Sequence, residues 1–215
     1  MRIRVVLLSL LFCCVFACPA WSQVQPVLYV SAGGAVAQGP ERFQDFYGMG
    51  PHVSVGAGVA LTPDVEIMIA GRYSRFQLDD DGVITFSERQ GGQFPNDVTL
   101  VVEGDAATAI GVDVNAKFST PLTPRARFYF SGGGGLFQRS VFGATLTAIQ
   151  PDGSEQSSTS EKVEETGASL NFGLGLSFSL SEPANIYVEP RYRLLFAESS
   201  DIFYLPIQVG LSYRL

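Results

Sequence analysis

Cysteine and tryptophan are almost absent from this 215-residue sequence, and the few copies stand at its beginning. All three cysteines (Cys13, Cys14 and Cys18) and the single tryptophan, Trp21, precede residue 22. A chain processed after Ser22 therefore has no disulfide, no thiol nucleophile and no cysteine-ligated metal. A secreted domain of this size must then be held together by its core or by surrounding lipid.

The first 22 residues predict an export signal. Two arginines precede the apolar run VVLLSLLFCCVFA, and Ala20-Trp21-Ser22 is a small-x-small cleavage site. Cleavage there starts the mature chain at Gln23, so we expect a signal peptide over 1–22 and one domain over 23–215. A lipoprotein site at Cys18 is the alternative, although the residues before it fit that pattern poorly.

Basic residues and long apolar runs are also scarce. Without the two arginines of the leader, the formal net charge falls from −7 to −9, which makes nucleic acid an unsuitable partner. Beyond residue 22 no apolar run approaches about 18 residues, so we expect no transmembrane helix. The only histidine is His52, which leaves few designs for a catalytic site.

What the sequence does contain is an alternation of apolar with small or polar residues in eight stretches, of which the fifth loses the pattern at Gly132–Gly135. The clearest are Ala168–Leu180 and the last thirteen residues, Phe203–Leu215. Both exceed the usual strand of about 5–6 residues but suit a tilted bilayer crossing of about 9–11. The other six are Val27–Ala37, Gly50–Leu61, Val65–Phe76, Ala107–Phe118, Ala126–Gln138 and Ile186–Glu198.

The connections between these stretches largely alternate between short and long. Short ones carry turn residues, such as Thr62-Pro63-Asp64, and this asymmetry is typical of barrels with short turns on one side of a membrane and long loops on the other. We expect the two longest connections to form hairpin extensions outside the membrane. The predicted pairs are Val83–Phe86 with Val98–Val102 and Val141–Ile149 with Ser157–Val163.

The C-terminal sequence QVGLSYRL is similar to the assembly signal of bacterial outer-membrane barrels through Gln208, Gly210, Tyr213 and Leu215, although an aromatic residue is commoner in last place. With the leader, the alternation and the loop lengths, the chain resembles the small OmpA/OmpX-like outer-membrane barrels. The resemblance implies an all-β fold: an eight-stranded antiparallel transmembrane up-and-down β-barrel with extended extracellular hairpins, located in the bacterial outer membrane. A soluble, lipocalin-like cup is the alternative.

The resemblance also implies partners. These are outer-membrane lipids and lipopolysaccharide, and the barrel assembly machinery during biogenesis, with the mature protein a monomer. The extracellular ligand is unknown.

Nine charged residues have the parity that points into the barrel. A buried charge must be paired, and eight strands leave little room for water. We therefore expect a salt-bridge network that plugs the lumen, and a gated ion path is the alternative. The residues are Glu66, Arg72, Asp113, Lys117, Arg127, Glu189, Arg191, Arg193 and Arg214.

Two further motifs contain residues that could carry chemistry. His52 and Ser54 are spaced like the His-x-Ser of outer-membrane lipid A deacylases, but both point into the lumen and no acid can be assigned to the histidine. Asp79-Asp80-Asp81-Gly82 could bind a hard cation, yet it lacks the twelve-residue calcium-loop pattern. We expect no enzyme activity, no cofactor and no metal site.

The expected function is therefore that of a non-enzymatic barrel whose extracellular loops serve surface binding or envelope integrity. The alternatives are a narrow, OmpW-like transport barrel for small or hydrophobic solutes and a lipid A-modifying enzyme.

Overall fold

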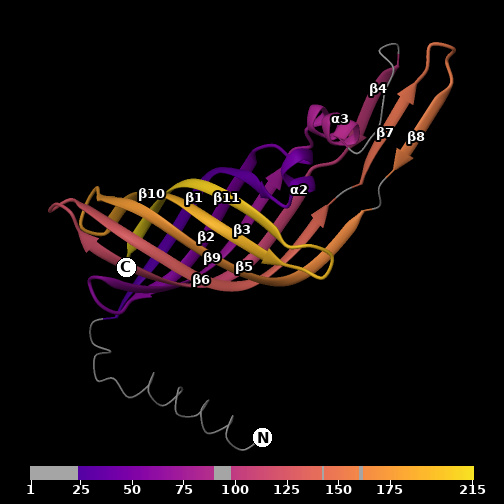
Figure 1. Cartoon of the computed structure of the whole chain (residues 1–215). Coiled ribbons are helices and arrows are strands. Elements are labelled where there is room, and N and C mark those ends of the chain that lie inside the picture. Colours follow the sequence, from indigo (N-terminus) through magenta and orange to yellow (C-terminus); the bar gives the residue numbers. More distant parts are fainter. Residues whose placement is uncertain (1–23, 90–97, 142, 160–161) are drawn as a thin grey trace, which may run out of the picture.

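The computed structural model describes residues 24–89, 98–141, 143–159 and 162–215. Each of the eight alternating stretches forms one long strand. They are β1 (Gln25–Gly39), β2 (Gly50–Ala60), β3 (Val65–Phe76), β5 (Ala107–Pro121), β6 (Ala126–Val141), β9 (Val163–Ser179), β10 (Ala184–Phe196) and β11 (Ile202–Arg214). These strands close into an antiparallel barrel in the order β1-β11-β10-β9-β6-β5-β3-β2 (Figure 1), so the fold prediction is confirmed.

Alternation decides which side chains line the barrel. Leu174 and Val209 are about half exposed on the outer surface, at 50% and 49%, whereas the polar residues between the apolar ones are buried inside. A lipocalin-like cup would place these apolar residues in its interior, so that alternative is wrong. Strand β1 pairs with β11, with Val30 opposite Leu211. Closure leaves no barrel edge with unpaired backbone groups, as hydrocarbon surroundings require.

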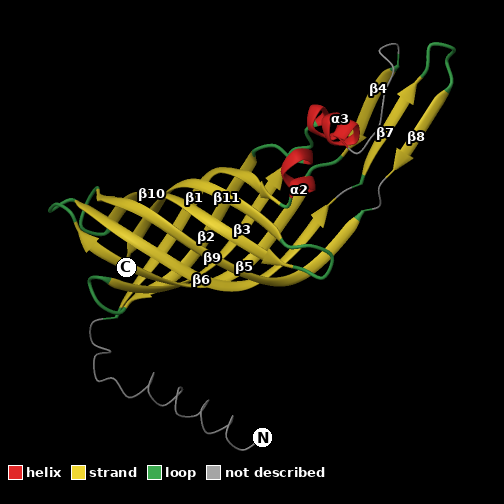
Figure 2. Cartoon of the chain, in the orientation of Figure 1, coloured by secondary structure: helices red, strands yellow, loops and turns green. Residues whose placement is uncertain are grey.

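The two ends of the barrel differ. The short connections 61–64, 122–125 and 180–183 lie at the end that carries the C-terminus, called the turn end below. The opposite end, the cap end, carries the helices and a second sheet (Figure 2). Its elements are α2 (Glu41–Phe46), α3 (Asp80–Arg89), β4 (Thr99–Gly104), β7 (Ala144–Ile149) and β8 (Glu155–Thr159), with sheet order β4-β7-β8.

One of the two predicted hairpins is wrong. Val83–Phe86 lies within α3, and β4 pairs with β7 instead, with Val102 opposite Leu146. A helix is favoured because the Asp79 carboxylate accepts a hydrogen bond from the backbone N–H of Gly82 at 3.2 Å, which caps the first turn. The aspartate run thus begins a helix.

Helix α3 is held in place by α2. The Phe86 ring packs edge-on against Phe46 with centroids 5.0 Å apart, and Arg89 Nη1 lies 3.0 Å from Asp45 Oδ2. Tertiary contacts therefore override the β-forming character of the sequence Val-Ile-Thr-Phe.

The other predicted hairpin is confirmed in its pairing. Strands β7 and β8 run antiparallel, with Thr145 opposite Thr159, and Gly153 adopts the positive φ of 85° that a tight turn needs. Val141 and Val163, which we assigned to this hairpin, instead pair with each other as the ends of β6 and β9. The sheet therefore projects from the barrel on extended strands (Figure 1).

Candidate functional site

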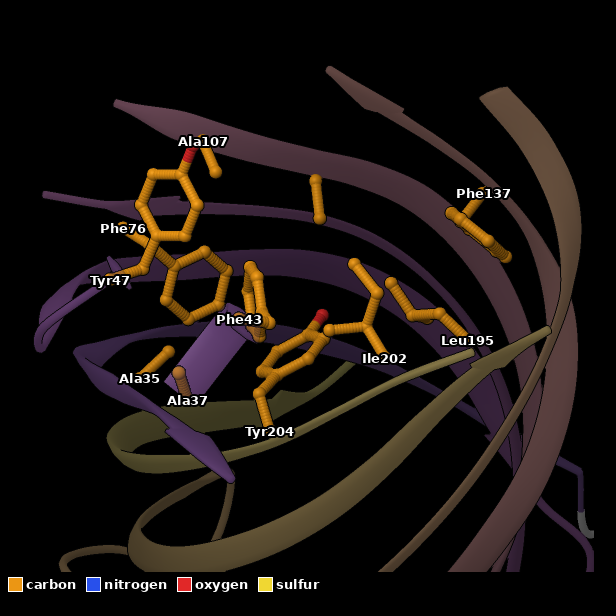
Figure 3. Close-up of a cluster of buried hydrophobic side chains, with 11 residues drawn as sticks. Ala35, Ala37, Phe43, Tyr47, Phe76, Ala107, Phe137, Leu195, Ile202 and Tyr204 are labelled. Atoms are coloured by element: carbon orange, nitrogen blue, oxygen red, sulfur yellow. The ribbon is translucent and has the colours of Figure 1, made fainter. Parts of the chain in front are cut away.

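An apolar plug closes the cap end of the lumen. Helix α2 brings Phe43 against Phe76 at a centroid distance of 5.1 Å, and Phe76 packs against Tyr204 at 5.2 Å (Figure 3). Tyr47 is buried in the same cluster, and burial raises its pKa to about 12, so its phenol stays neutral. The remaining space among these rings is a cavity of about 10 Å³. The plug leaves no room for a solute.

Below the plug, one carboxylate holds two arginines. Arg72 Nη1 and Arg193 Nη2 each lie 2.7 Å from Asp113 Oδ2, and Ser169 Oγ donates to Oδ1 at 2.6 Å. The Arg193 guanidinium also lies 5.7 Å from the Tyr204 ring centre, which joins this cluster to the plug. Asp113 is fully buried, so these contacts are shielded from solvent.

The second cluster surrounds Glu189 at mid-lumen. Its Oε1 accepts from Arg191 Nε at 2.5 Å, and its Oε2 accepts from the Tyr129 hydroxyl at 2.8 Å. Ser131 Oγ donates to Oε1 at 3.3 Å, and Arg191 Nη1 donates to Asn115 Oδ1 at 3.0 Å. Glu189 and Arg191 are 2% and 1% exposed, so each depends on these partners for charge compensation.

The third cluster, nearest the turn end, centres on Glu66. Lys117 Nζ lies 2.9 Å from Oε2 and Arg214 Nη2 lies 3.0 Å from Oε1, while the Tyr29 hydroxyl donates to Oε2 at 2.7 Å. The ammonium of Lys117 also sits 4.6 Å from the ring centre of Tyr129, a cation–π distance. Beyond this cluster the lumen widens into a polar vestibule of about 370 Å³.

The three clusters contain eight of the nine predicted lumen residues, and Arg127 stands apart. It pairs with Asp64 in the turn before β3 and donates to the Pro63 carbonyl at 3.1 Å. Its side chain is 32% exposed, because it starts β6 at the rim of the barrel. Arg127 therefore belongs to the turn end rather than to the buried network.

Sequence reasoning missed the neutral members of this network. Tyr29, Tyr129, Ser131 and Ser169 each donate to one of the three carboxylates. Their shared signal is inward parity, the same as that of the charged residues.

His52 and Ser54 do not pair with each other. The Nδ1 atom of His52 lies 2.8 Å from Ser74 Oγ on the neighbouring strand, whereas Ser54 Oγ lies 2.7 Å from Ser31 Oγ. His52 is 1% exposed inside the barrel, out of reach of any lipid. Within the described parts of the chain, moreover, no group of three or more histidine, cysteine or acidic residues could hold a metal ion. The Asp79 carboxylate instead accepts from the backbone N–H of Gly82 at the start of α3.

Two glycines of the barrel wall are covered by the rings of lumen tyrosines. A Cβ built at Gly175 would overlap the ring of Tyr129, and one at Gly210 would overlap the ring of Tyr187. The absence of a side chain at Gly175 thus lets Tyr129 reach Glu189. Gly210 has a packing role of the same kind, while the assembly role of Gln208, Gly210, Tyr213 and Leu215 stays a prediction.

We expect Gly175→Ala to lower the free energy of unfolding by about 1–3 kcal/mol, because the methyl group must push the Tyr129 ring aside. Urea unfolding in lipid vesicles, followed by tyrosine fluorescence, measures this. Gly48→Ala is the matched control, since a Cβ there has no described atom within 4 Å. Equal midpoints for the two variants would contradict the packing role of Gly175.

A closed antiparallel barrel with an apolar outer belt and paired charges inside defines a protein that crosses a membrane with its strands. The chain belongs to the outer membrane protein beta-barrel domain family, whose model matches residues 5–214. The family places it in the bacterial outer membrane. Because such barrels have short periplasmic turns and long extracellular loops, we expect the turn end to face the periplasm and the cap end to face the exterior. The predicted signal peptide lies outside the described residues and stays a prediction.

The solved structures similar to this chain include three bacterial outer-membrane proteins. Neisserial surface protein A (NspA) shares 13% identity at a TM-score of 0.55, over 88% of this chain and 97% of its own. Ail of Yersinia pestis shares 12% identity, over 89% and 97%, at a TM-score of 0.43. The N-terminal barrel of Pseudomonas aeruginosa OprF shares 15%, over 90% and 100%, at 0.41. At such identities the likeness concerns the fold alone.

No curated protein sequence matches the chain significantly. Among the described residues, no helix has both the length and the apolar character needed to span a membrane.

Proposed function

We propose that this protein is a non-enzymatic, non-conducting outer-membrane barrel that presents its β4-β7-β8 sheet to partners outside the cell. The observation that carries this proposal is the filled lumen. Side chains at mid-lumen leave a cavity of about 20 Å³, and the ring cluster around Phe43 closes the outer mouth. A narrow transport barrel, the alternative function, needs a continuous path that these side chains obstruct.

The projecting sheet offers a surface for binding. All five residues of β8 are exposed, and β8 is an edge strand with free backbone groups. The exposed Asp152 and Glu155 place negative charge at one end of this strand. An extended, basic segment of a partner suits such an edge, because it can add a strand and compensate the charge.

The proposed partners of the barrel itself are components of the cell envelope. Outer-membrane lipids and lipopolysaccharide surround the apolar belt, and the barrel assembly machinery acts on the chain during biogenesis. A monomer is sufficient for this role, since closure satisfies the strands within one chain.

We expect the protein in planar bilayers to show no conductance steps above the lipid background. The variant in which Glu41–Phe46 is replaced by a Gly-Ser linker provides the comparison, because it removes the helix that supplies Phe43 to the plug. Steady conductance of the unmodified protein would contradict the non-conducting barrel and favour transport.

Surface binding is tested with a library of ten-residue peptides screened against the protein in nanodiscs. The matched variant replaces Ala144–Thr159 with a Gly-Ser linker and leaves the eight barrel strands intact. We expect the unmodified protein to select basic, extended peptides that the variant does not bind. Equal selection by both proteins would exclude the sheet as the binding element.

A further inference from the structure

Positive charge exceeds negative charge in the lumen. The three clusters contain five cations and only three carboxylates, and each of Glu66 and Asp113 serves two cations. Arg214 is 31% exposed toward the vestibule, where water can compensate its charge. Arg72 and Arg193 have side chains only 3% and 2% exposed and share the single charge of Asp113. One positive charge therefore remains uncompensated at mid-lumen.

This charge cannot be removed by losing a proton, because an arginine side chain stays protonated in proteins. Nor do the described residues satisfy the guanidinium groups: the Nε atoms of Arg72 and Arg193 are buried and have no hydrogen-bond acceptor among them. An isolated buried charge with free donors is strongly unfavourable. The fold thus requires a further negative group near Arg72.

A small cavity lies where that group is needed. It measures about 20 Å³ and is lined by Arg72, Arg191 and Lys117, together with the polar side chains of Ser54 and Gln208. Roughly 10–15 Å³ of such volume holds one water molecule, so this cavity fits one particle of that size or slightly larger. Lys117 also lines the vestibule, so the cavity and the vestibule lie on either side of its side chain.

We propose that this cavity binds one monovalent anion of halide size, with Arg72 as its charged donor, because the N–H groups of Arg191 already donate to Glu189, Asn115, Asn171 and Ser131. Chloride is the halide expected. Glu189 is the one carboxylate in the lining, and its oxygens already accept from Tyr129, Ser131 and Arg191. A water molecule would occupy the space but leave the excess charge uncompensated, which is why an anion is favoured over water.

Crystals of the unmodified protein grown with sodium bromide locate the anion directly. We expect an anomalous bromide peak in the cavity, within hydrogen-bonding distance of Arg72. Density that shows water only, with no anomalous signal, would overturn the proposal. This experiment needs no variant and so does not depend on whether any substitution folds.

Stability in solution gives a second test. In chloride above its dissociation constant, each tenfold increase should lower the unfolding equilibrium constant about tenfold, whereas gluconate at equal ionic strength should not. Arg72→Met should abolish the difference between the salts, and Arg127→Met, which alters a cation at the turn end, should preserve it. Equal stability of the unmodified protein in both salts would refute the site.

Discussion

Replacing Glu189 with glutamine should lower the free energy of unfolding by about 3–5 kcal/mol, the cost of breaking a buried ion pair by removing one partner. Glutamine keeps the size of the side chain, but it has no charge to offer the guanidinium of Arg191. Arg191 is 1% exposed, so water cannot replace the lost charge. Tyr129 and Arg191 donate to different oxygens of Glu189. The glutamine amide has only one acceptor oxygen, so it loses one of these two hydrogen bonds.

The measurement is equilibrium urea unfolding in lipid vesicles. Glu182→Gln is the matched control, because Glu182 is exposed in the turn between β9 and β10 and an exposed charge contributes at most about 1 kcal/mol. If the urea midpoint of Glu189→Gln equals that of the Glu182→Gln control, water must reach mid-lumen and compensate Arg191. Such a result would also revive the transport alternative.

The barrel was predictable because alternation and loop length are properties of the local sequence, and an even number of membrane strands must close to satisfy their backbone groups. Each strand of the barrel buries every second residue, so the eight stretches were evident without knowledge of their partners. The register between strands was less accessible. Asp113 meets Arg72 on β3, a neighbour in the barrel, but also Arg193 on β10, across the lumen. The tilt of the strands determines which inward side chains come into contact across the lumen, whereas parity shows only that they point inward.

The plug shows a different limit. Helix α2 has six residues, too few for a helix to be stable by itself, so its existence depends on the barrel that receives it. Phe43, Phe46 and Tyr47 stand at helical spacing, which was the available signal. The same reasoning explains α3, where a short run of β-forming residues became a helix because α2 was there to pack against.

The orientation of the strands in the membrane yields the last prediction: Leu174→Arg should destabilise the barrel by about 2–4 kcal/mol in bilayers, the cost of arginine on the lipid face near the midplane. Leu174 points outward from β9, opposite Phe130 on β6, and is 50% exposed. The adjacent Gly173 faces Glu189, so Leu174 stands at the height of the mid-lumen cluster, far from either interface.

Leu180→Arg makes the same chemical change at a different depth. Leu180 follows β9 at the turn end and is 63% exposed, so its arginine reaches the headgroup region and should cost about 0–1 kcal/mol. Unfolding free energies of both variants in vesicles of one lipid composition give the comparison. Both substitutions replace an exposed leucine with arginine, so equal costs would show that Leu174 does not face hydrocarbon, whereas the expected difference reflects the greater depth of Leu174 in the membrane.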